Sequence, residues 1–98
     1  MLRVTVDQAD GEFVTLKLEG KLAGVRVLEL NRVWQALEPS LGSRKLSVDL
    51  RGVTFADSKG KQALAEIHSR TGATFLADTP LTKYFAEEAQ QSIRTNWK

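Results

Sequence analysis

Asp57 and Ser58 are the residues of this sequence whose types and position best suit a chemical role. They stand directly before an apolar series of helical spacing, and both side chains can accept hydrogen bonds from free backbone N–H groups at a helix N-terminus. A phosphate on the Ser58 hydroxyl would lie at the positive end of that helix, and it would add about 1.5 to 2 negative charges. Lys59 and Lys61 follow closely and are predicted to balance part of this charge. The simpler alternative is that Asp57 and Ser58 only cap a helix, with the lysines on a solvated face.

His68 is the only histidine and lies near the far end of the same predicted helix. At about 1.5 Å per residue, it is roughly 15 Å from Ser58 along the helix axis, which is too far for a Ser–His pair. A lone histidine without any cysteine is also a poor metal site. We therefore expect His68 on the helix surface, and we expect neither a metal nor a cofactor.

The acidic residues do not suggest a catalytic cluster. Asp49, Asp57 and Asp78 differ from the pattern of a receiver domain, because no adjacent acidic pair follows the first predicted strand. Glu87 and Glu88 are an adjacent pair, but they fall on a predicted helix. A position on its solvated surface explains them more simply than acid–base chemistry does.

Two strands are predicted at the start of the chain, where apolar and polar residues alternate over 2–6 and 14–18. Asp10-Gly11 provides a turn between them, so the two strands are expected to form a hairpin. Gly20 is predicted to end the second strand.

The apolar spacing changes to three- and four-residue steps from about Val25, which predicts an amphipathic helix with Trp34 in its buried series. This helix is expected to stop just before Pro39. A third strand follows over 46–50, with Val53 and Phe55 as further inward-facing candidates.

The C-terminal half is predicted to contain two more helices around a short buried strand over 74–77. The first helix starts at Asp57-Ser58 and is capped by Gly72. The second starts with Thr79 as N-cap and Pro80 at its first position. Its inward-facing residues are predicted to be Leu81, Tyr84, Phe85 and Ala89. The tail over 90–98, which includes Trp97, is compatible with an edge strand or a continued helix.

This order of elements predicts one α/β domain over residues 1–98, with a largely parallel sheet that starts with an antiparallel hairpin. Functional groups in such sheets gather beyond the carboxyl ends of the parallel strands. Two segments, 53–61 and 77–80, occupy those positions.

Composition narrows the class of function. The net charge of +2 is small for a nucleic-acid-binding protein, and no basic stripe with interleaved aromatic residues is present. The chain has no cysteine, no pattern of a signal peptide and no apolar stretch long enough to cross a bilayer. We therefore expect a cytoplasmic protein that does not bind nucleic acid and does not insert into a membrane, with a working surface in place of a deep pocket.

A resemblance to STAS domains, the sulfate transporter and anti-sigma-factor antagonist family, is carried by the segment Val53-Thr54-Phe55-Ala56-Asp57-Ser58-Lys59-Gly60. The family has two apolar positions around a Thr or Ser, then Asp, Ser or Thr, a small residue and Gly. The strand at 48–50 precedes this motif at the expected distance. Residues 16–22 and 72–80 also resemble family segments, in the expected order. Lys59 and Lys61 depart from the small and apolar residues that the family has there.

The resemblance implies a STAS-like mixed sheet of four or five strands, antiparallel at its start and then largely parallel, with about three helices packed on it. It also implies a bacterial anti-sigma-factor antagonist that is not an enzyme and that regulates transcription by partner switching. Ser58 would be the phosphorylation site, a serine-kinase anti-sigma factor and a phosphatase would be the partners, and Asp57 would cap the helix and orient the loop. The expected partner-binding residues are Asp57, Ser58, Lys59, Gly60, Lys61 and Thr79. The oligomeric state stays open, a homodimer included.

Two alternatives remain. The first is a constitutive adaptor that resembles the STAS subunits of lipid-transport ATP-binding-cassette complexes and contacts an ATPase subunit. Lys59 and Lys61 favour it, because a permanent salt-bridged contact would tolerate them. The second is a small hydrolase or transferase with Ser58 as nucleophile. It is the weakest, because no base lies within reach and the chain is short for a pocket.

Overall fold

The computed structural model describes residues 1–8 and 11–95, with side chains up to residue 90. Four strands and three α-helices follow one another in the predicted order. They are β1 (Leu2–Asp7), β2 (Phe13–Leu22), α1 (Arg26–Leu37), a 3₁₀ turn η1 (Glu38–Ser40), β3 (Lys45–Ala56), α2 (Ser58–Thr71), β4 (Thr74–Leu76) and α3 (Pro80–Thr95).

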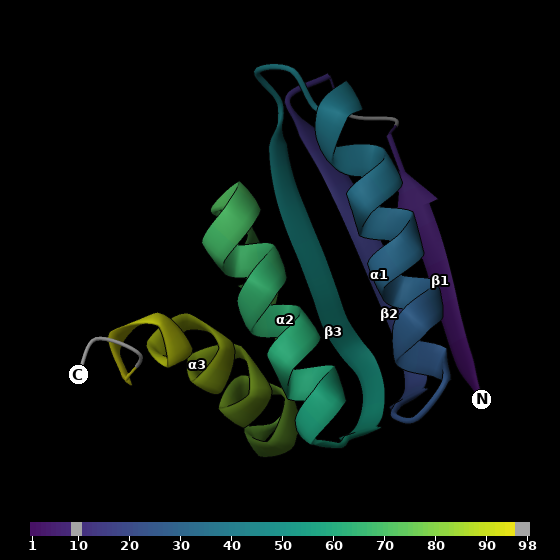
Figure 1. Cartoon of the computed structure of the whole chain (residues 1–98), viewed down its shortest axis with the longest axis vertical. Coiled ribbons are helices and arrows are strands. Elements are labelled where there is room, and N and C mark those ends of the chain that lie inside the picture. The colour runs from purple at the N-terminus through teal and green to yellow at the C-terminus, as the bar shows by residue number, and fades with distance from the viewer. Residues whose placement is uncertain (9–10, 96–98) are drawn as a thin grey trace.

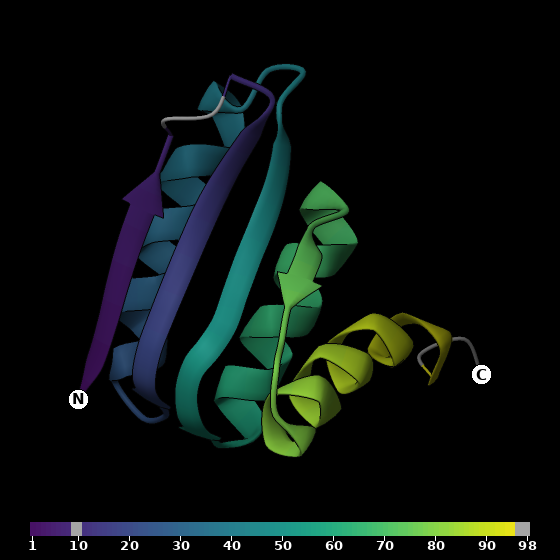
Figure 2. The same cartoon turned by 180° about the vertical axis from the view of Figure 1, so that it is seen from behind.

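The four strands form one mixed sheet in the order β1-β2-β3-β4. β1 pairs antiparallel with β2, while β3 lies parallel to both β2 and β4. Helices α1 and α2 cover one face of this sheet (Figure 1), and the view from behind shows the strands in front of them (Figure 2). α3 packs against α2 on the β4 side of the sheet. The predicted mixed α/β sheet is therefore confirmed.

The core lies between the sheet and the two helices that cover it. β2 and β3 supply fully buried alternate residues, and α1 supplies a stripe at helical spacing. Trp34, in that stripe, is only 1% exposed, so its predicted core position is confirmed. The central residues of this cluster are Leu16, Leu18, Leu30, Trp34, Val48, Leu50, Leu64 and Ile67.

The helix ends agree with the local signals in the sequence. α1 ends at Leu37, and Pro39 lies in the 3₁₀ turn that follows, since proline cannot donate the next helical hydrogen bond. α2 is followed by Gly72 in the left-handed conformation, with its N–H donating to the His68 carbonyl at 2.9 Å. Before α3, Thr79 Oγ1 accepts from the Thr82 N–H at 3.1 Å, which confirms Thr79 as the N-cap.

β2 is longer than predicted, and Gly20 does not end it. The strand continues through Gly20, at φ 102°, to Leu22. The hairpin extends with it, because the Lys21 N–H donates to the Met1 carbonyl at 3.1 Å.

Phe55 is 49% exposed, so its predicted inward orientation is wrong. The register between β2 and β3 shifts twice, between Lys17 and Glu19 and again after Gly20. Such bulges rotate the following residues relative to the sheet. Beyond Leu50 they turn Val53 and Ala56 inward, at three-residue steps, and Phe55 outward.

The last strand and helix also differ from expectation. β4 is an edge strand in which Thr74 and Leu76 are exposed, so the predicted buried strand is wrong. Along α3, Phe85 and Ala89 are buried as predicted, but Leu81 and Tyr84 are 45% and 47% exposed. Their place is taken by Thr82, which is 1% exposed and whose hydroxyl accepts from the N–H groups of residues 78 and 79. The apolar stripe of α3 that is buried is therefore narrower than predicted, because it includes Phe85 and Ala89 but not Leu81 or Tyr84.

The chain over 90–95 is helical and not a strand. Trp97 lies outside the described residues. Among the residues that the structure describes, no helix combines the length and the apolar character needed to cross a membrane.

Candidate functional site

Asp57 lies at the junction of β3 and α2, and its carboxylate ties two loops together. Its Oδ1 accepts from the Gly60 N–H at 2.8 Å, which caps α2. Its Oδ2 accepts from the Gly24 N–H at 2.9 Å, in the loop before α1. The backbone N–H of Asp57 donates to the Leu22 carbonyl at 3.2 Å. One residue thus fixes the start of α2 against the end of β2 and the start of α1.

The charge of Asp57 is stabilised by these contacts. The N–H groups of Gly24 and Gly60 lower the pKa of its carboxyl below the ordinary value of 3.8, and the positive charge of Lys59 lowers it further. Asp57 is therefore ionised at neutral pH, directly beside Ser58.

Ser58 is the first residue of α2 and is exposed. Within the described part of the chain its hydroxyl makes no hydrogen bond. Two N–H groups at the start of α2 are in use, because Gly60 donates to Asp57 Oδ1 and Lys61 donates to the Asp57 carbonyl at 2.9 Å. A phosphate on Ser58 would thus stand directly beside the ionised carboxylate of Asp57.

The side chains of Lys59 and Lys61 have different neighbours. Lys59 is exposed and lines a groove between α1 and α2. The Lys61 ammonium lies 3.5 Å from Glu88 Oε1 and 5.3 Å from the centre of the Tyr84 ring. Lys61 therefore links α2 to α3, and of the two lysines only Lys59 is left beside Ser58.

Gly60 and Thr79, two further residues of the predicted site, have structural roles. Gly60 is buried, and a Cβ atom there would collide with the Leu22 carbonyl oxygen. Its lack of a side chain lets α2 approach the end of β2. Thr79 is exposed and caps α3, whose N-terminus lies at the same end of the molecule as that of α2 (Figure 1).

A groove with a volume of about 440 Å³ separates the first halves of α1 and α2. Its α1 side includes Val25 and Leu28, which are 74% and 61% exposed, and its α2 side includes Lys59, Ala63 and Glu66. The sequence analysis missed this surface. Leu28 is off the buried stripe of α1, and such a leucine was the signal that could have revealed it.

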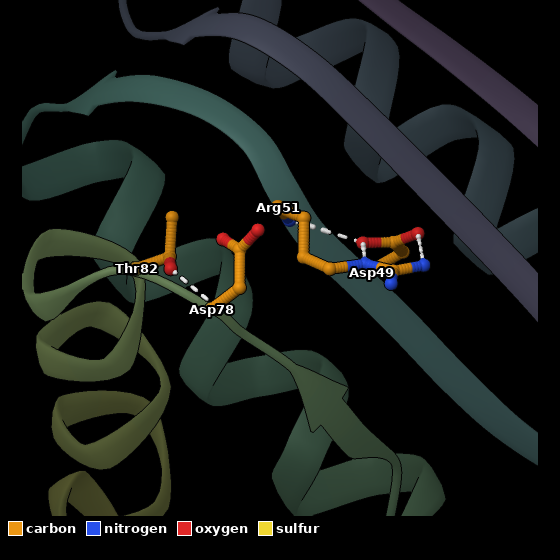
Figure 3. A network of polar contacts seen from close by, with 4 residues as sticks. All are labelled: Asp49, Arg51, Asp78 and Thr82. Carbon is orange, nitrogen blue, oxygen red and sulfur yellow. Dashed lines mark hydrogen bonds and ion pairs between the residues drawn. The ribbon is translucent and has the colours of Figure 1, made fainter.

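Asp49 belongs to the polar alternation of β3, yet it is only 4% exposed. Arg51 covers it on the same strand, with Nε 3.0 Å from Oδ1 and Nη2 3.0 Å from Oδ2 (Figure 3). This pairing lowers the pKa of Asp49 although burial acts in the opposite direction. Asp78 lies nearby, and the negative charges of Asp49 and Asp78 raise the pKa of Arg51. Asp49 and Asp78 thus belong to a structural network separate from Asp57.

His68 is half-buried near the other end of α2, where its Nδ1 lies 2.9 Å from the Ala73 carbonyl oxygen and its ring lies beside Phe75. It fastens the end of α2 to β4. His68 and Ser58 thus lie near opposite ends of α2, as predicted, and do not form a Ser–His pair.

No protein-family model matches this chain, and no curated protein matches it either. The topology nevertheless defines a known class, the SpoIIAA-like or STAS fold. The structure is similar to the crystal structure of an anti-sigma factor antagonist from Mycobacterium paratuberculosis, with a TM-score of 0.66 and 20% identity over 98% of this chain and 80% of that one. It is also similar to an uncharacterised protein of the DUF3478 family with a SpoIIAA-like fold from Shewanella loihica PV-4, with a TM-score of 0.56 and 11% identity over 98% of this chain and 78% of that one. These likenesses confirm the predicted fold.

Proposed function

We propose that this chain is a non-enzymatic protein-interaction module of the anti-sigma-factor antagonist type, switched by phosphorylation of Ser58. Its partners would be a serine-kinase anti-sigma factor, which binds and phosphorylates it, and a phosphatase that resets it. Such a partner-switching role places the protein in the bacterial cytoplasm, where it regulates transcription indirectly.

The observation that carries this proposal is the exposed Ser58 hydroxyl at the start of α2, held in place by the two hydrogen bonds of the Asp57 carboxylate. A kinase needs an accessible hydroxyl, and Ser58 provides one. The STAS fold, shared with an anti-sigma factor antagonist, supports the same role.

The surface beside Ser58 supports binding to a protein partner. Val25 and Leu28 are apolar and exposed, and Lys59 adds a positive charge to the same groove. Exposed apolar side chains rimmed by polar ones are typical of protein-binding surfaces. The partner surface that we propose comprises the groove, Ser58 and the Gly24 loop.

The switch would be electrostatic. Because Asp57 is ionised, a phosphate on Ser58 would place about 1.5 to 2 further negative charges next to an existing one. Like charges at an interface oppose association. A partner that accepts the surface with Asp57 alone would be released after phosphorylation, without any refolding.

The first test is the intact mass of the protein from its native cells, before and after phosphatase. We expect an increment of ~80 Da that phosphatase removes. It should be absent from Ser58→Ala and retained in Thr54→Ala, a control that removes an exposed hydroxyl close by on β3. An unmodified mass under every growth condition would contradict the proposal.

The second test is the affinity for the purified serine-kinase anti-sigma factor of the same organism. Ser58→Glu should weaken binding roughly tenfold, about 1.4 kcal/mol, whereas Ser58→Ala should bind like the unmodified protein. Equal affinities of the two variants for the anti-sigma factor would contradict the proposed switch.

The alternative of a constitutive ATPase adaptor loses part of its support. It relied on Lys59 and Lys61 making permanent salt bridges to a partner, and Lys61 is paired with Glu88 within the chain. A Ser–His pair does not support a nucleophilic role for Ser58, since His68 contacts Ala73 at the far end of α2.

A further inference from the structure

Strand β1 is an edge of the sheet. Among the strands that the structure describes it pairs only with β2, and the register of all six residues in Leu2–Asp7 is continuous. It contains no proline and no bulge, two of the features with which proteins block edge pairing, and its two charged side chains, Arg3 and Asp7, are of opposite sign. β4, at the opposite edge, has only three residues. An open strand of this kind is a template for pairing with another strand.

The backbone groups that point outward from β1 can be assigned from its pairing with β2. The Lys21 N–H donates to the Met1 carbonyl, one step along the same register. Hydrogen-bonded and non-hydrogen-bonded pairs alternate along an antiparallel ladder. The odd-numbered residues of β1 therefore bond to β2, and the even-numbered residues, Leu2, Val4 and Val6, present their N–H and C=O groups to the open edge.

We propose that β1 pairs antiparallel with β1 of a second copy of this chain, about a two-fold axis at Thr5. In this register Val4 of each copy lies opposite Val6 of the other, and each such pair exchanges two N–H···O bonds. Arg3 of each copy lies opposite Asp7 of the other. These are non-hydrogen-bonded positions, where opposed side chains come closest.

The charges of β1 select this register among those that the outward backbone groups allow. An axis at Arg3 would oppose two arginines, and an axis at Asp7 would oppose two aspartates, both of which are unfavourable. An axis at Val4 or Val6 would place Thr5 opposite one of the two charges and leave no Arg–Asp pair. Only the axis at Thr5 pairs Arg3 with Asp7 twice.

The side chains of β1 are suited to this contact. Arg3, Thr5 and Asp7 are exposed on one face of the strand. On the other face Val4 packs partly on the core and Val6 is 37% exposed, so pairing covers Val6 with a valine of the second copy. Both faces are self-complementary, which is what an isologous interface requires.

The dimer would join two four-stranded sheets into one continuous sheet. Since the paired strands are antiparallel, the Ser58 ends of the two copies would point in opposite directions. Ser58 stands at the end of β3, two strands away from the interface, so both sites stay accessible. The module would then present two partner surfaces at opposite ends. This inference rests on β1 and holds whether or not Ser58 is phosphorylated.

The test is sedimentation of the full chain over a range of protein concentrations. An edge-strand contact falls in the small, transient class of interfaces, so we expect dimers to form at concentrations on the order of 100 µM and to weaken as salt rises. Arg3→Asp and Asp7→Arg should each be monomeric at the same concentration, because each opposes like charges. An equimolar mixture of the two variants should associate again, since every Arg–Asp pair is restored between them.

Lys83→Asp is the matched control, because it reverses a charge on the exposed surface of α3. It should dimerise like the unmodified chain. Amide exchange gives a second readout that does not depend on the charges: the Val4 and Val6 amides should gain protection with rising concentration, and the Thr5 amide should not. A monomeric chain at about 1 mM, or single reversals that dimerise like the unmodified chain, would overturn the proposal.

Discussion

The carboxylate of Asp57 accepts one hydrogen bond from its own helix and one from a loop 33 residues earlier in the chain. A capping residue usually satisfies only the helix that follows it. Here the second bond fixes the Gly24 loop, and thereby one side of the groove, relative to Ser58. Asp57 is thus a positioning residue for the surface proposed to bind the partner.

Asp49 is the other carboxylate whose ionisation depends on its neighbours. The Arg51 guanidinium holds the pKa of Asp49 below 3.8, against the effect of burial. A carboxyl with a lowered folded-state pKa stabilises the protein at pH values above its unfolded pKa. This contribution is lost as the pH falls through the folded-state pKa. Asp49 should therefore support the fold at neutral pH and cease to do so in acid below pH 3.8.

We predict that Arg51→Met raises the pKa of Asp49, because the hydrogen bonds from the guanidinium are removed while burial remains. The stability that Asp49 contributes above its unfolded-state pKa should then shrink, so the loss of stability in acid should be smaller than in the unmodified chain. NMR titration of the Asp49 carboxyl measures the first effect, and chemical denaturation as a function of pH measures the second. Arg26→Met, which removes an exposed ion pair with Glu29, should change neither. An unaltered Asp49 pKa in Arg51→Met would contradict this assignment.

At the scale of elements, the contact between the start of α2 and the end of β2 sets the position of Ser58. Gly60 lies against the Leu22 carbonyl with no room for a Cβ atom. The resemblance placed Gly60 among partner-binding residues, and its burial favours a packing role. The close approach brings the Asp57 backbone within reach of the same carbonyl.

We predict that Gly60→Ala destabilises the protein by about 1 to 3 kcal/mol, the usual range for overpacking. This loss would occur although alanine is the better helix former by about 1 kcal/mol. Gly11→Ala is the control, because no atom lies within 4 Å of a Cβ atom built there. Urea denaturation of both variants measures the difference. Equal stabilities would show that α2 can shift away from β2 at little cost.

At the scale of the whole molecule, the sheet buries the apolar faces of α1 and α2 but leaves their first halves apart, and the groove lies between them. Leu28 and Val25 are exposed there because they lie beside, and not on, the stripe of α1 that faces the sheet. Both side chains are available to a partner without disturbing the core.

We predict that Leu28→Ser weakens binding to the serine-kinase anti-sigma factor roughly tenfold, about 1.4 kcal/mol. It should change the free energy of unfolding by no more than about 0.5 kcal/mol, as is usual for surface substitutions. Leu81→Ser removes a comparably exposed leucine from α3 and should leave binding unchanged. Calorimetric titration and urea denaturation separate the two effects. If both variants bind alike, the groove is not the partner surface.

The sequence by itself determined the order of the elements, the antiparallel start of the sheet, the Asp57 cap before α2 and the Thr79 cap before α3. These features depend on periodicity and on residues close together in the chain, so they can be predicted locally. The tertiary structure alone decided that Lys61 pairs with Glu88, that Gly60 packs on Leu22, and that Phe55 and Tyr84 point outward. Each of these depends on strand register or helix rotation, which is set by packing between segments far apart in the sequence.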